Sequence, residues 1–88
     1  MKRYELELSR EASRVLERMA EREPEIYARV AKALDDLEQH PFQGKSLKGE
    51  LKGRYSHRVG SYRIIYRVYQ DKLLVIVVDI GHRRDIYR

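Results

Sequence analysis

Residues 54–80 read RYSHRVGSYRIIYRVYQDKLLVIVVDI, and this stretch decides the fold. Two short turn signals, Gly60-Ser61 and Gln70-Asp71, divide it into three runs that are rich in β-branched and aromatic residues. These runs predict strands over residues 54–59, 62–69 and 73–80. Because two-residue turns join antiparallel neighbours, the three strands are expected to form an antiparallel meander. The third run is apolar at nearly every position, which is typical of a strand inside a sheet.

The first half of the chain supplies the elements that cover such a sheet. Alternating apolar and polar residues predict a strand over residues 2–8. Ser9 is suited to cap a helix over residues 10–22, whose apolar side chains repeat at helical spacing. A second amphipathic helix begins near Pro24 and is ended by Pro41. The very short connection between the two helices predicts a nearly antiparallel helical hairpin.

The order β-α-α-β-β-β predicts an α+β fold, with the helical hairpin on one face of a small, mostly antiparallel sheet. The 88 residues are enough for a single domain over residues 1–88. The sequence contains no Cys, which excludes a disulfide framework and a Cys nucleophile and agrees with the cytoplasm. It has no apolar run near 18 residues, so no association with a membrane is expected.

Positive charge is concentrated in the second half of the chain. The whole sequence carries 19 Lys and Arg against 14 Asp and Glu, and residues 44–88 hold 11 of the basic residues but 4 of the acidic ones. Such a surface can be a solvated one, or it can bind a polyanion or an acidic protein. Residues 42–53 lack a consistent period and are expected to form a basic connecting loop with Lys45, Lys48 and Lys52.

Alternation along the predicted strands places several basic residues on one face of the sheet. The members of this arginine cluster are Arg54, Arg58, Arg63 and Arg67, with Ser56 between them. If the helices leave this face open, the repulsion between neighbouring guanidinium groups calls for an anionic partner, and phosphate is the natural one. The alternative for any single arginine is a pair with an acidic residue on a neighbouring strand.

Several kinds of chemistry lack the residues that they need. The sequence has no His-x-x-x-His motif, no paired carboxylates at metal-ligand spacing and no Gly-rich phosphate loop, so we expect neither a metal nor a cofactor. RNA, in contrast, carries its own nucleophile, the 2′-hydroxyl. A protein can cleave it by stabilising negative charge at phosphorus and by supplying a proton acceptor and a proton donor.

Two residues near the C-terminus suit those proton transfers. His82 carries an imidazole, a common general acid or base in enzymes, and Tyr87 can stack on a base or donate a proton. A surface role for His82 and packing of Tyr87 onto the sheet are the plainer alternatives. His57 is expected to face the helices or an edge, outside this site.

Two segments carry a resemblance to a known family: residues 53–68, GRYSHRVGSYRIIYRV, and residues 80–87, IGHRRDIY. The chain resembles the RelE/ParE superfamily of toxins from toxin–antitoxin pairs over essentially its whole length. The resemblance implies a RelE-like fold and an endoribonuclease that cuts mRNA in the ribosomal A site. Attack of the 2′-hydroxyl on the adjacent phosphodiester would leave a 2′,3′-cyclic phosphate. A cognate antitoxin, bound in a hetero-oligomer, is the implied partner.

The resemblance also implies roles for particular residues. Arg63 matches the arginine that stabilises the transition state, Arg83 matches a C-terminal arginine that assists the phosphate or leaving group, and Tyr87 matches a tyrosine that stacks on a base. Further RNA contacts are expected from Lys45, Lys48, Lys52, Arg54, Ser56, Arg67 and Arg84.

This sequence departs from the best-known RelE members on the strand before the Gly60-Ser61 turn. Those members place two lysines there, one of them a candidate for the base, whereas this chain has Ser56 and Arg58. Arg58 can bind phosphate, but a guanidinium is a poor proton acceptor. Either His82 or His57 would then take the role of the base, or the enzyme would be slow. The resemblance favours His82, because several sister families in the superfamily use a histidine near the C-terminus.

Two other functions remain open. ParE-type members keep the fold, lack the ribonuclease residues and inhibit DNA gyrase by binding it as a protein. A chain that has lost toxicity would only pair with its antitoxin. Retention of Arg63, Arg83 and Tyr87 together favours RNA cleavage.

Overall fold

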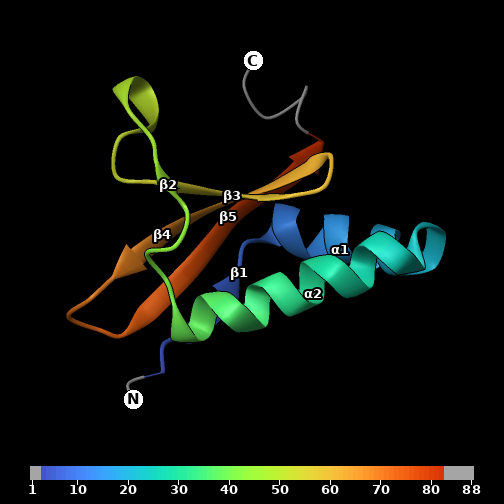
Figure 1. Cartoon of the computed structure of the whole chain (residues 1–88), viewed down its shortest axis with the longest axis horizontal. Helices are drawn as coiled ribbons and strands as arrows, with labels where there is room; N and C mark the ends of the chain where they lie inside the picture. The colour runs from blue at the N-terminus through green and yellow to red at the C-terminus, as the bar shows by residue number, and fades with distance from the viewer. Residues whose placement is uncertain (1–2, 83–88) are drawn as a thin grey trace.

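The structure, a computed structural model, describes residues 3–82 of the chain. Its elements are β1 (Glu5–Leu8), α1 (Arg10–Arg22), α2 (Pro24–Gln39), β2 (Lys45–Ser46), the short 3-10 helix η1 (Gly49–Leu51), β3 (Tyr55–Val59), β4 (Tyr62–Tyr69) and β5 (Leu74–His82). The strands form one sheet in the order β1-β5-β4-β3-β2 (Figure 1). β1 is parallel to β5 and the other neighbours are antiparallel, so the predicted α+β class is confirmed.

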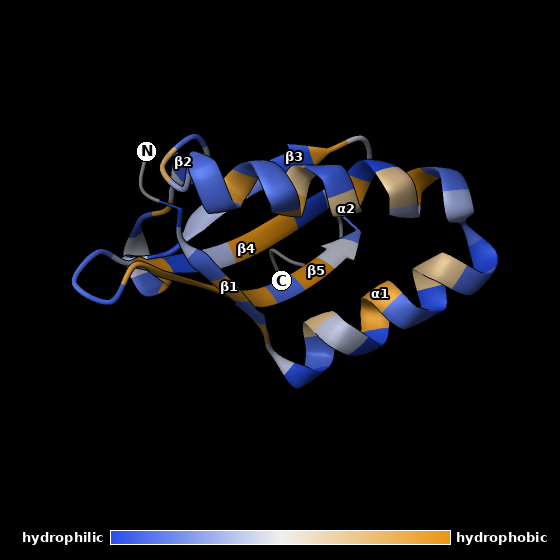
Figure 2. Cartoon of the chain, turned by 90° about the horizontal axis from the view of Figure 1, so that it is seen from below, coloured by the Kyte–Doolittle hydropathy of each residue, from blue (hydrophilic) through white to orange (hydrophobic). Residues whose placement is uncertain are grey.

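The two helices form the predicted hairpin on one face of the sheet (Figures 1 and 2). The Ser9 hydroxyl accepts a hydrogen bond from the Ala12 backbone N–H at 3.1 Å, which caps α1 where the sequence predicts. Glu23 is the single residue between the helices, and Pro24 begins α2 where its missing N–H costs nothing. Neither helix is long and apolar enough to cross a membrane, a finding limited to residues 3–82.

The core lies between this hairpin and the sheet. Figure 2 shows apolar colouring along β4 and β5 beneath the helices. The largest fully buried side chains are Tyr66, Leu37, Ile64, Ile80, Val30, Val75 and Val77. They come from α2, β4 and β5, and α1 adds the buried Ala12 and Met19, so removal of apolar surface from water holds both helices on one face of the sheet. None of the elements between residues 3 and 82 covers the opposite face of the sheet, which is called the open face below.

The structure refines two sequence predictions. The first strand is shorter than residues 2–8 within the described part of the chain, since β1 spans Glu5–Leu8. Residues 42–53 form a connecting loop with Lys45, Lys48 and Lys52, but it contains two short regular elements that the sequence analysis does not predict. Lys45 and Ser46 pair with β3, and η1 follows them. The outer edge of β3 presents backbone groups that need partners, and a two-residue strand satisfies them without any period in the sequence.

An irregularity in β5 changes which side chains face the helices. Ile65 pairs with Asp79 and Tyr66 pairs with Val77, so Val78 is an extra residue on β5. A bulge of this kind shifts the alternation by one residue. Val77 is buried before it and Ile80 is buried after it, although their spacing is odd. The bulge therefore decides which face each residue at the end of β5 occupies.

Candidate functional site

The open face of the sheet carries most of the arginine cluster. Arg58 on β3 lies directly opposite Arg63 on β4, and Gly81 on β5 lies on the other side of Arg63. Arg67 follows on β4 with the same alternation. Cross-strand partners share a face, so three arginines from two neighbouring strands lie on the face that the helices leave open. Gly81 contributes no side chain to this row.

Arg63 is oriented by a neighbouring hydroxyl group. Its Nη1 donates a hydrogen bond to the Ser56 Oγ at 3.1 Å. Ser56 is buried, with 3% of its surface exposed, and its backbone is held between Ile65 on β4 and Lys45 on β2. Because Ser56 sits inside the sheet, this bond fixes the direction of a half-buried guanidinium group.

The basic loop lies along the outer edge of β3. Lys45 in β2 and Lys48 and Lys52 on either side of η1 are all exposed. The Leu47 N–H donates to the carbonyl oxygen of Arg54 at 2.9 Å, which joins the loop to the start of β3. Arg54 is half-buried, and its Nε is buried without a hydrogen-bond partner within the described ranges.

Acidic side chains lie at the β1 edge of the open face, on the side of the sheet away from the basic loop. Glu7 on β1 pairs with Ile76 on β5, which pairs in turn with Arg67 on β4, so an apolar residue separates the two charges. Within residues 3–82 neither Arg58 nor Arg67 forms an ion pair. The open face therefore runs from an acidic edge at β1 to a basic region at β3 and β4.

His82 does not share the face of Arg63. It pairs with Tyr62, and the two rings meet edge to face with centroids 5.7 Å apart, on the side of the sheet that the helices cover. The Tyr62 hydroxyl donates to the Glu23 carboxylate at 2.8 Å, which, with burial and the negative charge of Glu23, raises the pKa of Tyr62. The bulge at Val78 causes this placement.

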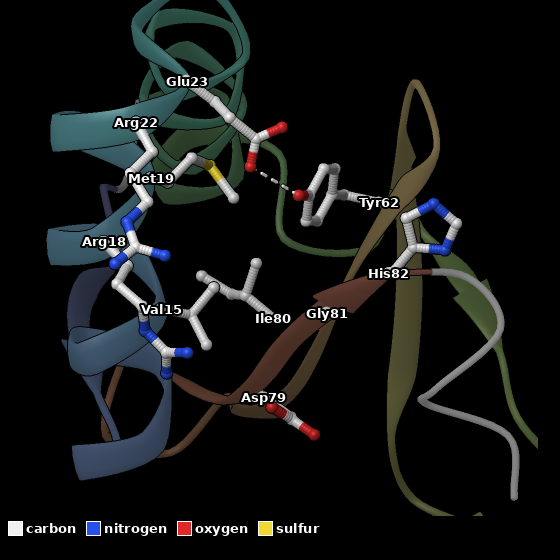
Figure 3. Close-up of a pocket in the computed structure, with 10 residues that line it drawn as sticks. All are labelled: Val15, Arg18, Met19, Arg22, Glu23, Tyr62, Asp79, Ile80, Gly81 and His82. Carbon is white, nitrogen blue, oxygen red and sulfur yellow. Dashed lines mark hydrogen bonds between the residues drawn. The ribbon is translucent and has the colours of Figure 1, made fainter.

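Tyr62 and His82 form one wall of a cleft of about 430 Å³ between α1 and the end of β5. Figure 3 shows the opposite wall, where Arg18 and Arg22 project from α1. Residues from both walls and from the floor line this cleft: Val15, Arg18, Met19, Arg22, Glu23, Tyr62, Asp79, Ile80, Gly81 and His82. Arg58, Arg63 and Arg67 do not line this cleft, although Asp79 and Gly81 of β5 lie between it and the open face.

His57 also faces the helices, as the sequence predicts. It lies in a groove at the edge of the sheet with Arg29, Lys32 and Asp36 of α2. Burial lowers the pKa of His57, and the nearby Asp36 carboxylate opposes that shift in part. The open face therefore holds neither of these two imidazoles.

The three remaining site predictions, Arg83, Arg84 and Tyr87, lie outside the described residues. Over the range that the structure describes, no three His, Asp or Glu side chains gather where they could hold a metal ion.

The structure adds two groups that the sequence analysis did not select. Asp79 pairs with Ile65 and so lies on the open face, beside the row of Arg63. A carboxylate inside an otherwise apolar central strand is a signal for a bulge, because a regular strand would bury it with Val75 and Val77. The second group is the hydroxyl of Tyr66, which accepts a hydrogen bond from the Gly44 N–H at 3.0 Å. No period in the sequence indicates that contact.

Comparisons with known proteins agree with this geometry. Residues 6–87 match the model of the family described as the ParE toxin of the type II toxin–antitoxin system parDE. Toxin RelG of Mycobacterium tuberculosis is 42% identical over 67 residues, which are 74% of this chain and 77% of the relative.

Solved structures show the same fold. A chain of the toxin–antitoxin complex RelBE2 from Mycobacterium tuberculosis superposes with a TM-score of 0.83 at 33% identity, and the match covers 97% of both chains. A YoeB/ParE toxin from Agrobacterium tumefaciens gives a TM-score of 0.80 at 19% identity, covering 89% of this chain and 96% of the other. The order of the elements, the matched family model and the similar toxins agree with one another. The chain therefore belongs to the RelE/ParE superfamily of type II toxin–antitoxin toxins.

Proposed function

We propose that this protein is a metal-independent endoribonuclease that cleaves mRNA, with the ribosomal A site as the place of cleavage. The observation that carries the proposal is the pair Arg58 and Arg63, which lie opposite each other on the open face. Two neighbouring guanidinium groups repel each other and favour an anionic ligand between or above them. The bond from Arg63 to Ser56 orients one of the two groups in advance.

The proposed reaction uses a nucleophile that the substrate supplies. The 2′-oxygen of one ribose forms a bond to the adjacent phosphorus, and the bond from phosphorus to the 5′-oxygen of the next nucleotide breaks. A base takes the proton of the 2′-hydroxyl, and an acid protonates the leaving 5′-oxygen. Negative charge builds up on the phosphoryl oxygens, where the guanidinium of Arg63 stabilises it and Arg58 assists.

Other roles in the proposal come from the family resemblance. Arg83 assists at the phosphate or the leaving group, and Tyr87 stacks on a base. The structure does not favour His82, the candidate from the sequence, as proton acceptor, because its ring lies beside Tyr62 on the side of the sheet that the helices cover, away from a phosphodiester held at Arg63. We therefore expect His82→Ala to lose less activity than Arg63→Ala, because charge stabilisation on the open face supplies the larger share of the rate.

The same proposal includes a cognate antitoxin. The solved relatives include the toxin–antitoxin complexes RelBE2 and YoeB-YefM, which supports a hetero-oligomer for this chain as well. Leu8 and Tyr27 expose 37% and 36% of their surfaces and line a shallow groove with Leu16 and Ala20, between the hairpin and β1. The apolar stripe of an amphipathic antitoxin helix fits such a groove.

Replacing Arg63 tests the site directly. Arg63→Ala is expected to lower the rate of RNA cleavage by about 10²-fold or more, since one donor aimed at developing charge is worth several kcal/mol. Arg14→Ala is the matched control, because it removes the same charged group from an exposed position on α1. Circular dichroism checks that both variants are folded. If Arg63→Ala cleaves RNA as fast as Arg14→Ala, the proposed site is wrong.

Inhibition of DNA gyrase is the second candidate, and the match to the ParE toxin model favours it. In this alternative the basic open face would contact a protein and no phosphodiester would be cut. A supercoiling assay with purified protein separates the two functions. Inhibition of gyrase without any RNA cleavage would replace the nuclease proposal.

A further inference from the structure

The buried hydroxyl of Tyr66 connects the core of the protein to the basic loop. Tyr66 is fully buried in β4, and its ring stacks on Tyr55 with centroids 5.5 Å apart. Tyr55 in turn meets the ring of Phe42 edge to face, at 5.6 Å. At the end of this aromatic row the Tyr66 Oη accepts the hydrogen bond from Gly44. Gly44 is the last residue before β2, so the bond lies at the entry to the basic loop.

The backbone at Gly44 lies too close to its neighbours for any side chain. A Cβ atom at this position would overlap the Tyr66 hydroxyl and lie 2.9 Å from the carbonyl oxygen of Ser56. Glycine is therefore required by close approach, because its backbone bears no abnormal φ. The loop therefore packs directly against two residues of the sheet, Tyr66 and Ser56. Ser56 also accepts the hydrogen bond from Arg63.

We propose that Tyr66 is a positioning residue, which anchors the basic loop so that its lysines bind the RNA backbone next to the phosphodiester held by Arg63. The inference rests on the proposed nuclease function. Lys45 follows Gly44 directly and pairs with Ser56, so the anchor and the arginine site share one strand pairing. Lys48 and Lys52 follow within the same loop, where they are exposed. An RNA strand that crosses Arg63 would meet these ammonium groups at flanking phosphates.

The ring of Tyr66 and its hydroxyl have different tasks. A phenylalanine at this position would keep the stacking on Tyr55 and the packing beneath the helices. The hydroxyl, in contrast, is costly to bury unless it is hydrogen-bonded. Its bond to Gly44 joins the loop to the sheet at the end opposite to the contact between Leu47 and Arg54. Removal of the oxygen alone therefore tests the anchor while the core stays filled.

The first test is a comparison of Tyr66→Phe with Tyr69→Phe. Tyr69 ends β4, and its hydroxyl makes no hydrogen bond to any residue between positions 3 and 82. Loss of one hydrogen bond of ordinary strength predicts a KM for RNA about 5-fold higher in Tyr66→Phe, with kcat changed by less than about 2-fold. Tyr69→Phe should match the wild type. Amide hydrogen exchange at Gly44 and Lys45 should be faster in Tyr66→Phe alone.

The second test is a double-mutant cycle with Gly44→Ala. This substitution is expected to raise KM by about 10-fold or more, because the loop must move away from Ser56 and Tyr66. In the Tyr66→Phe background the same substitution should cost less, since the missing hydroxyl leaves part of the required space. Additive effects of the two substitutions on KM would contradict the anchor.

The results of these tests distinguish a failure of the proposed Tyr66 anchor from a failure of the proposed nuclease function. If the wild type cleaves RNA and Tyr66→Phe keeps the KM of Tyr69→Phe, the inference is overturned and the nuclease proposal stands. A lower melting temperature of Tyr66→Phe with unchanged KM has the same meaning, because it shows a purely structural role. A wild type that neither cleaves nor binds RNA overturns both proposals, whatever the exchange rates are.

Discussion

The hydrogen bond between Arg63 and Ser56 shows how a single contact orients a charged group of the proposed site. Ser56 is 3% exposed, and its short side chain lies beside Arg63 without adding a second positive charge there. Its hydroxyl oxygen accepts a hydrogen bond from the guanidinium, so Ser56 is an orienting partner for the arginine. The proposed chemistry consequently depends on charge stabilisation more than on a base from β3.

His57 gives a residue-scale prediction about pH. Burial holds the pKa of His57 below its ordinary value near 6.5, so the unfolded chain binds a proton at a higher pH than the folded protein does. Stability that is present above pH 6.5 is therefore lost as the pH falls through the folded-state pKa. His57→Gln should reduce the loss of stability between pH 7 and pH 5.

Urea denaturation at a series of pH values measures this effect. His40→Gln is the control, because it removes an imidazole from an exposed position at the end of α2. An unchanged pH dependence in His57→Gln, with a native structure, would show that His57 does not contribute to acid destabilisation.

At the scale of elements, Ser9 links the start of α1 to the bulge of β5. Its hydroxyl caps the helix and also donates a hydrogen bond to the Val78 carbonyl oxygen at 2.6 Å. Val78 is the extra residue of the bulge, and a bulge leaves backbone groups without ladder partners. One side chain therefore stabilises both the helix terminus and the irregularity that moves Asp79 to the open face.

Ser9→Ala should lower the free energy of unfolding by about 1–2 kcal/mol, since it removes the cap and leaves the Val78 carbonyl without its partner. Ser61→Ala is the matched control in an exposed turn, and it should change stability by less than about 0.5 kcal/mol. Chemical denaturation gives both values. Equal stability of the two variants would mean that the Ser9 contacts contribute no net stabilisation.

The sequence predicts the regular elements well and the irregular ones poorly. β4 spans the predicted residues 62–69, because two turn signals bound a run of β-branched and aromatic residues. β2 was missed because its two residues are held by pairing with β3 and by the contact of Gly44 with Tyr66, neither of which has a local sequence signal. The arginine face follows from alternation alone. The position of His82 does not, because the bulge reverses its face.

For the whole molecule, the distribution of apolar and charged side chains matches the two proposed partners, an antitoxin and RNA. The hairpin side, with its exposed apolar groove at Leu8 and Tyr27, suits an amphipathic antitoxin helix. The opposite face carries Arg58, Arg63 and Arg67 and suits a nucleic acid. An antitoxin that also covers the open face would block RNA by competition.

Binding of single-stranded RNA should therefore weaken steeply with salt. Each phosphate contact contributes about 0.7 to the slope of log Kd against log salt concentration. Arg58→Ala should reduce this slope by about 0.7, because Arg58 is an exposed member of the cluster, and Arg14→Ala should leave it unchanged. Fluorescence anisotropy over a range of salt concentrations measures the slopes. Identical slopes for the two variants would remove Arg58 from the RNA-binding surface.

The most direct test of the nuclease proposal is cleavage of a short mRNA by purified protein that is free of antitoxin. The reaction is run with and without programmed ribosomes, and a second mRNA carries a 2′-deoxy sugar at the cut nucleotide. The proposal predicts cleavage that ribosomes stimulate, a 2′,3′-cyclic phosphate product and no cleavage of the 2′-deoxy substrate. Cleavage of the 2′-deoxy substrate, or no cleavage by a folded protein under either condition, would contradict it.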